Sequence, residues 1–111
     1  MKIPHESTEQ IALVKRMRRE GIVFYAVPNG AHVEPHHRGK LIAEGLEAGV
    51  SDLVVLKYKD ALYLEMKRRK GGAWGQAQKE WKVKVESLGF KYVVAKGAKE
   101  AWEQIENFRN K

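Results

Sequence analysis

Apolar positions at helical spacing predict three helices along this chain. The first covers residues 7–20 and is followed by Gly21, a residue that commonly ends a helix. The second covers residues 74–88, and the third covers residues 98–108. The apolar stripe of the second helix contains one amide among large hydrophobic side chains: Trp74, Gln78, Trp81, Val85 and Leu88.

Runs of β-branched and aromatic residues predict four strands. Two of them, residues 52–56 and 61–67, are separated by the short segment 57–60, which predicts a tight hairpin. The other two strands cover residues 22–27 and 90–95.

The segment between the first two strands has little periodicity. Residues 29–50 contain three histidines, one proline and four glycines, and we interpret them as a long loop with a short helix near residues 39–44. A loop of this length inside a compact domain is more often functional than incidental. The elements then follow in the order αβββαβα. This order predicts an α/β fold with one mixed sheet flanked by helices, within a single domain of residues 1–111.

The charge balance favours polyanionic partners. Lysine and arginine number 21 against 14 acidic residues, which gives a net charge of +7 and a pI near 9.7. Such a balance favours nucleic acid or an anionic membrane surface, although it also serves solubility alone. The chain has no cysteine, which excludes disulfides, zinc ribbons and thiol catalysis. No signal segment and no apolar run of about 18 residues is present, so we expect a cytoplasmic protein without a membrane partner.

One strand carries a polar face. Alternate side chains of a strand share a face, so Tyr63, Glu65 and Lys67 lie together. The opposite face is apolar and belongs to the core: Leu62, Leu64 and Met66. Asp52 begins the partner strand of the hairpin. We therefore expect Asp52 and Glu65 to converge at one end of the sheet.

Two carboxylates and an ammonium group at one place suit the hydrolysis of a phosphodiester bond. Asp52 and Glu65 would bind Mg²⁺ or Mn²⁺, both of which prefer oxygen ligands. Lys67 would orient or deprotonate the attacking water, or stabilise the charge of the transition state. The same pattern is also typical of a solvated strand face with cross-strand ion pairs. Residues 49–51 favour the catalytic interpretation, because a tight turn there leaves the aspartate exposed at the start of its strand.

Two further polar residues have two interpretations each. A buried Gln78 either bonds to the backbone or directs its amide at the catalytic strand, where it would hold a water or a phosphate. Glu9 lies in the first turn of the first helix, where a carboxylate interacts favourably with the helix dipole. Alternatively, Glu9 is a third acidic group near the metal. The residues alone leave both choices open.

Several cationic and polar side chains near the predicted site are candidates for contacting nucleic acid. A basic run after the catalytic strand can clamp phosphates, although such a run is more often a solvated loop. The long loop adds further candidates, and the full set is Asn29, Arg38, Lys40, Arg68, Arg69 and Lys70. Zinc-binding spacing is missing among the four histidines, to which we assign no role: His5, His32, His36 and His37.

The order of these motifs resembles that of VRR-NUC domains, a compact branch of the PD-(D/E)XK nuclease superfamily. The resemblance runs from Glu9 to the last helix. Residues 45–53 resemble the family's G-x-x-x-G-V-P-D-L segment, with Ser51 in place of the proline. Residues 64–67 resemble its E-x-K strand, and residues 78–81 resemble its Q-x-x-W helix.

The resemblance implies a restriction-endonuclease-like core and a metal-dependent endonuclease that cuts DNA. By position, Asp52 and Glu65 would bind the metal together with the backbone carbonyl of Met66. Lys67 would act on the attacking water or the scissile phosphate. Gln78 would then support the site.

The resemblance also implies a third acid, a class of substrate and an assembly. Glu9 would be the accessory acid on the first helix. Stand-alone domains of this size resemble phage or bacterial proteins, which would act in the host cell on branched DNA such as four-way junctions. They are linked to homodimers, and symmetric cutting by a domain with one site also needs two copies.

Two other functions remain open at this stage. A catalytically inactive nucleic-acid-binding module on the same fold would show the same charge, but it would not need Asp52, Glu65 or Lys67. An unrelated α/β interaction protein would leave the carboxylate–lysine face and the amide of Gln78 as coincidences. Metal-dependent cleavage distinguishes the enzyme from both.

Overall fold

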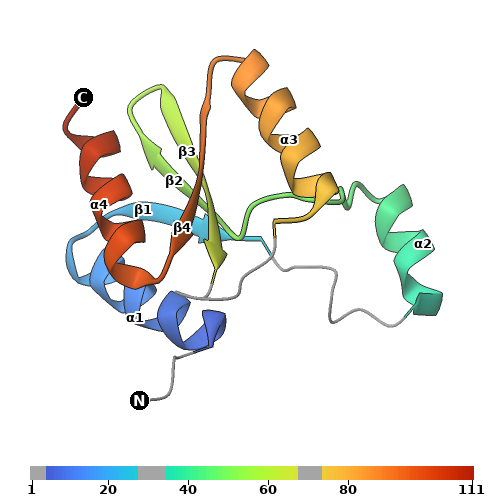
Figure 1. Cartoon of the computed structure of the whole chain (residues 1–111), viewed down its shortest axis with the longest axis horizontal. Coiled ribbons are helices and arrows are strands. Elements are labelled where there is room, and N and C mark those ends of the chain that lie inside the picture. The colour runs from blue at the N-terminus through green and yellow to red at the C-terminus, as the bar shows by residue number, and fades with distance from the viewer. Residues whose placement is uncertain (1–4, 28–34, 68–73) are drawn as a thin grey trace.

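A four-stranded mixed sheet with helices on both faces forms the body of the molecule (Figure 1). It is seen in a computed structural model that describes residues 5–27, 35–67 and 74–111. The strands lie side by side in chain order: β1 (Val23–Ala26), β2 (Leu53–Lys57), β3 (Asp60–Lys67) and β4 (Lys91–Lys96). The first two pairings are antiparallel, and β4 joins β3 in parallel. The predicted mixed sheet flanked by helices is therefore confirmed.

The helices divide between the two faces of the sheet (Figure 1). They are α1 (Glu6–Arg19), α2 (Pro35–Ala43), α3 (Gln76–Ser87) and α4 (Ala98–Arg109). The first and last pack against each other and against β3 and β4 on one face. On the other face, α3 crosses over from β3 to β4, which is the helical connection that a parallel pair requires. None of these helices is long and apolar enough to span a membrane.

The hydrophobic core lies between the sheet and the pair formed by α1 and α4. Its members alternate along the strands and follow helical spacing on the helices, as the sequence pattern predicts. The fully buried side chains include Leu13, Met17, Leu53, Leu62, Leu64, Met66 and Ile105. β3 is buried along nearly its whole length because α3 covers its second face as well. The polar residues of that second face are therefore enclosed rather than solvated.

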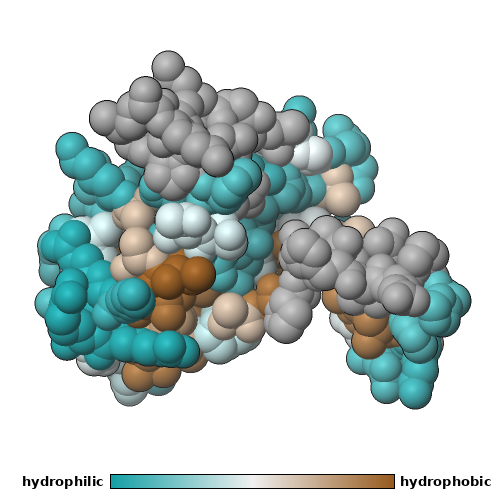
Figure 2. Space-filling view, turned by 90° about the horizontal axis from the view of Figure 1, so that it is seen from below, coloured by the Kyte–Doolittle hydropathy of each residue, from teal (hydrophilic) through white to brown (hydrophobic). Residues whose placement is uncertain are grey.

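The helix α2 is longer than predicted and stands away from the body. The short helix expected at residues 39–44 spans Pro35–Ala43, so the observed order contains one more helix than αβββαβα. Proline is favoured in the first turn of a helix, where its missing N–H is not needed. Figure 2 shows α2 as a separate lobe. The radius of gyration, 14.3 Å, exceeds the roughly 13 Å expected for a compact chain of this length.

The ends of α3 differ from the prediction. Trp74 precedes the helix, and Leu88 is its C-cap residue and is 74% exposed. The predicted helix begins two residues too early and ends one residue too late, because periodicity does not show where the backbone leaves the helix. Of the predicted stripe, Val85 is buried, whereas Gln78 and Trp81 are half-buried.

Candidate active site

Asp52 and Glu65 face each other across the β2–β3 hairpin. Leu53 pairs with Leu64, so continuing this antiparallel register by one residue puts Asp52 opposite Glu65 on the face covered by α3. The carboxylate of Asp52 accepts a hydrogen bond of 2.7 Å from the backbone N–H of Met66. That bond fixes the aspartate against the strand that carries the glutamate, as the hairpin predicted.

Glu65 is a buried carboxylate with two side-chain donors. It is 2% exposed, and one of its oxygens, Oε2, lies 3.3 Å from Nζ of Lys67. The same oxygen accepts a hydrogen bond of 2.6 Å from Nε2 of Gln78 on α3. A buried carboxylate is stable only when charge and hydrogen bonds compensate its lost hydration. The solvated-face interpretation of the Glu65–Lys67 pair is therefore wrong, since Lys67 is also buried, at 8% exposure.

Gln78 bonds both to the backbone and to the strand β3. Its Oε1 accepts a hydrogen bond of 3.0 Å from the backbone N–H of Gly75, just before α3. Its Nε2 donates to Glu65. One amide thus tethers the first turn of α3 to β3, which explains a glutamine on the apolar stripe.

The turn before Asp52 lies directly against α3. Gly49 has φ +83°, and a Cβ built there would lie 2.2 Å from the carbonyl oxygen of Ala77. Only glycine permits both that dihedral angle and that approach. Ser51, which stands where the related motif has proline, is buried and donates through Oγ to the carbonyl oxygen of Leu53 at 3.2 Å. The turn thereby holds Asp52 and Gln78 in a fixed relation.

Glu9 connects α1 to α4, which lies beside it in the same layer. Its carboxylate accepts a hydrogen bond from the backbone N–H of Ala98, at the first turn of α4. A carboxylate there also interacts favourably with the dipole of that helix. Next to it, the N–H of Gly97 donates to the carbonyl oxygen of Lys67 at 3.0 Å. Glu9 therefore lies near the end of β3 and interacts with the dipole of α4 as well as with that of its own helix.

Tyr92 is a site residue that the sequence analysis missed. In the β3–β4 register it pairs with Tyr63, and Glu65 pairs with Val94, so Tyr92 lies on the same face as Glu65. Its ring is almost fully buried. Burial, followed by the carboxylates of Glu65 and Asp52, raises the pKa of the Tyr92 phenol above its ordinary value. Both carboxylates thus act on one buried hydroxyl. Only the parallel strand pairing, which local patterns do not reveal, could have indicated it.

Two of the six predicted nucleic-acid contacts, Arg38 and Lys40, lie in the part of the chain that the structure describes, both on α2. Lys40 is exposed on α2, and the structure describes the backbone of Arg38 there but not its side chain. Four candidates lie outside the described residues: Asn29, Arg68, Arg69 and Lys70. Two of the histidines, His36 and His37, are exposed on α2 with ring centroids 4.0 Å apart.

The donor set suits a hard divalent cation. In the part of the chain that the structure describes, no cluster of three or more His, Cys, Asp or Glu residues could hold a metal. Mg²⁺ does not need one, because it binds through one or two carboxylates and keeps waters and phosphate oxygens as its remaining ligands. Asp52 and Glu65 are all-oxygen ligands, and the hydrogen bond from Met66 holds the aspartate against the strand that carries Glu65. The residues therefore fit Mg²⁺ or Mn²⁺, with the carbonyl of Met66 on the same strand.

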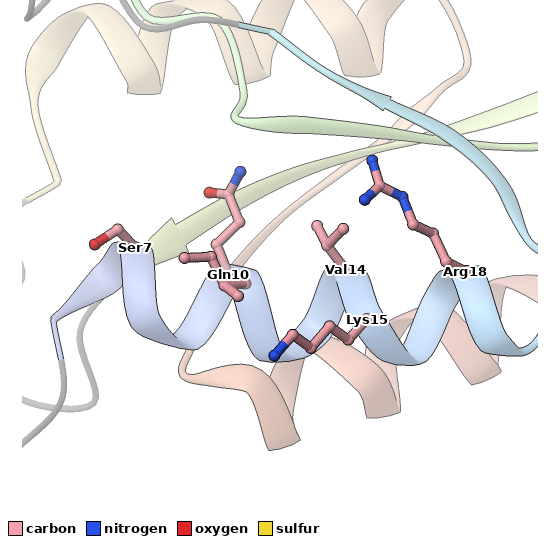
Figure 3. A pocket seen from close by; sticks show the side chains of 6 residues that line it. Ser7, Gln10, Val14, Lys15 and Arg18 are labelled. Atoms are coloured by element: carbon pink, nitrogen blue, oxygen red, sulfur yellow. The ribbon is translucent and has the colours of Figure 1, made fainter.

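One flank of α1 forms a groove with a basic rim. Its described lining is Ser7, Gln10, Ile11, Val14, Lys15 and Arg18, and none of these side chains is acidic. Figure 3 shows Gln10, Val14 and Arg18 pointing from α1 toward the strands. The guanidinium of Arg18 lies 6.0 Å from the ring centroid of Phe24 on β1.

Comparison with solved structures finds a protein with a similar fold. A "VRR_NUC domain protein" superposes with a TM-score of 0.80 at 21% sequence identity, over 96% of this chain and 89% of the other. The fold is that of a VRR_NUC domain. No family model matches the sequence, and no curated protein matches it. The VRR_NUC likeness shows the fold and agrees with the family resemblance that the motifs indicated.

Proposed function

We propose that this chain is a metal-dependent endonuclease that hydrolyses phosphodiester bonds in DNA. The observation that carries the proposal is the enclosed carboxylate of Glu65, held by Lys67 and Gln78 opposite Asp52. A structural protein gains little from such an arrangement, because a buried ion pair seldom stabilises a fold more than apolar side chains of similar size. Buried charged groups of this kind cluster at functional sites.

Each residue has a role that follows from its position. Asp52 and Glu65 would hold the cation, with the carbonyl of Met66 as a third oxygen ligand. When bound, the cation supplies Lewis-acid polarisation of the phosphodiester. Lys67 would orient the attacking water or stabilise the developing charge on the phosphate, since its ammonium group lies beside Glu65.

The supporting residues act through the ligands. Gln78 would hold Glu65 in a single orientation, because its amide is fixed at both ends. Glu9 would be the accessory acid at the end of β3. Neither residue needs to touch the substrate for these roles.

The positive net charge of the chain favours DNA as its partner. The net charge of +7 favours a polyanion, and the groove on α1 has two cations, Lys15 and Arg18, in its lining. Lys15 and Arg18 would contact phosphates, and Ser7 and Gln10 would donate hydrogen bonds to them. The predicted contacts from Asn29, Arg38, Lys40 and residues 68–70 would extend this surface.

A double substitution tests the groove. We expect Lys15→Ala with Arg18→Ala to weaken binding to duplex DNA and to reduce the salt slope of log K by about 1.8, or about 0.9 per lost phosphate contact. The measurement is fluorescence anisotropy across a range of salt concentrations. The matched control is Lys84→Ala with Lys99→Ala, two exposed cations outside the groove. Equal slopes for both double variants would refute the role of the groove.

Branched DNA and a dimer extend the proposal. A chain with one site cuts one strand at a time, so symmetric cleavage of a four-way junction would need two copies. The competing function is a binding module without catalysis. It would bind DNA with the same groove, but no cation would be required.

The decisive experiment is a cleavage panel. Purified protein is incubated with labelled linear duplex, single-stranded, flap and four-way-junction DNA in Mg²⁺, Mn²⁺ or EDTA, beside an Asp52→Asn variant. We expect cleavage that needs the cation, disappears in the variant and is fastest on branched substrates. Binding without cleavage under every metal condition would leave the binding module as the function.

A further inference from the structure

Tyr92 has a buried hydroxyl without a hydrogen-bond partner among the described residues. The residue is 2% exposed, yet no donor or acceptor of the described chain reaches its oxygen. A buried hydroxyl left unpaired costs about 1–3 kcal/mol. A phenylalanine at this position would avoid that cost, so packing alone does not account for the tyrosine.

The surroundings of this hydroxyl are acidic and closed to solvent. Glu65 and Asp52 both act electrostatically on Tyr92, which shares the face of the sheet that carries them. Above it lies α3, which contacts β4 and places Nζ of Lys82 3.5 Å from the carbonyl oxygen of Tyr92. The phenol therefore lies between the sheet and α3, on the face of the sheet that carries Glu65.

A second donor in the same layer also lacks an acceptor. Nε1 of Trp81, one turn after Gln78 on α3, is buried without a partner among the described residues. Buried water typically makes about three hydrogen bonds to polar groups that would otherwise be unsatisfied. A hydroxyl, an indole N–H and two carboxylates in one layer supply the donors and acceptors that such a water needs.

We propose that Tyr92 is a positioning residue whose hydroxyl donates a hydrogen bond to a water held by the carboxylates of Asp52 and Glu65. The water would orient the two carboxylates toward the cation. Tyr92 then acts on metal binding through the ligands and touches neither the cation nor the substrate. This proposal rests on the proposed function, because it assigns Tyr92 to the same cation site.

The test is the affinity for Mn²⁺ in the absence of DNA. Tyr92→Phe removes one oxygen and keeps the ring. Loss of a supporting hydrogen bond around a metal site typically weakens the affinity by about 10–100-fold. We expect a weakening in this range, measured by electron paramagnetic resonance of free Mn²⁺. Tyr63→Phe is the matched control, since it makes the same change on the same face at the paired position of β3. Tyr63→Phe should bind Mn²⁺ within about twofold of the parent chain, since the hydroxyl of Tyr63 is not proposed to support the metal ligands.

Thermal unfolding without metal separates positioning from a structural role. A purely structural hydroxyl would change the melting temperature of Tyr92→Phe and leave the Mn²⁺ affinity alone. The positioning role predicts the opposite result: Tyr92→Phe has a weaker affinity for Mn²⁺ and the same melting temperature as the parent chain. Equal affinities for Tyr92→Phe and the parent chain would overturn the inference about Tyr92 and leave the cation site standing. A parent chain that binds no Mn²⁺ would overturn both, and that outcome is visible in the first titration.

Discussion

Replacing Lys67 by alanine is expected to lower the rate of cleavage by about 10²–10³-fold, the usual effect of losing one electrostatic contact to a transition state. Its ammonium group is 3.3 Å from Oε2 of Glu65 and is shielded from water, so its field is strong where charge develops on the phosphate. The rate is measured in single-turnover cleavage at saturating protein and Mg²⁺. Under those conditions weaker binding of DNA does not affect the result.

Lys96→Ala is the matched control for Lys67→Ala. Lys96 pairs with Lys67 in the β3–β4 register but is exposed, so its removal changes the same charge without entering the site. Its cleavage rate should stay within about twofold of the parent rate, because exposed charges are screened by solvent. Lys67→Met removes the charge but retains most of the apolar side chain. A loss of activity in this variant is therefore not caused by a cavity that unfolds the protein. Cleavage at the parent rate by a folded Lys67→Ala or Lys67→Met protein would show that Lys67 takes no part in catalysis.

The local sequence pattern predicts most of this fold, because the periodicity of apolar residues along a strand or helix also decides which side chains are buried. The strands of the hairpin end within one residue of their predicted limits, since residues 62, 64 and 66 alternate toward the core. The pattern does not predict features that depend on contacts between elements, such as the end of a helix. Leu88 looks like a member of the apolar stripe of α3, but the helix stops before it. The helix α2 has little periodicity because it packs against little of the body (Figure 1).

The candidate site was predictable where its residues share a strand or a hairpin. Glu65 and Lys67 are two residues apart on β3, and the hairpin register brings Asp52 to them. The other partners come from separate layers. Tyr92 arrives through a parallel pairing across a whole helix, and Glu9 reaches the N-terminus of α4 through a contact between residues 89 positions apart. Such contacts depend on how helices dock, and a single sequence does not encode that in any local spacing.

Gly49→Ala is expected to destabilise the protein by about 2–5 kcal/mol and to impair cleavage. Two costs add. The dihedral φ of +83° disfavours any residue with a Cβ, and the new methyl group would lie 2.2 Å from a backbone oxygen of α3. Backbone atoms cannot rotate away as a side chain can, so α3 must shift. Urea unfolding monitored by circular dichroism gives the free energy of unfolding.

Gly89→Ala separates the two costs. Gly89 has a similar φ of +91°, but a Cβ there meets nothing within 4 Å. Its replacement should therefore cost only about 1–2 kcal/mol, from the dihedral angle alone. The excess at Gly49 measures the close approach of the turn to α3, and that approach holds Gln78 over Glu65. If the two substitutions cost the same, the contact is dispensable, and the turn fixes Asp52 without help from the helix. If Gly49→Ala costs more and cleavage falls with it, the glycine positions the catalytic carboxylates by bringing two backbones together.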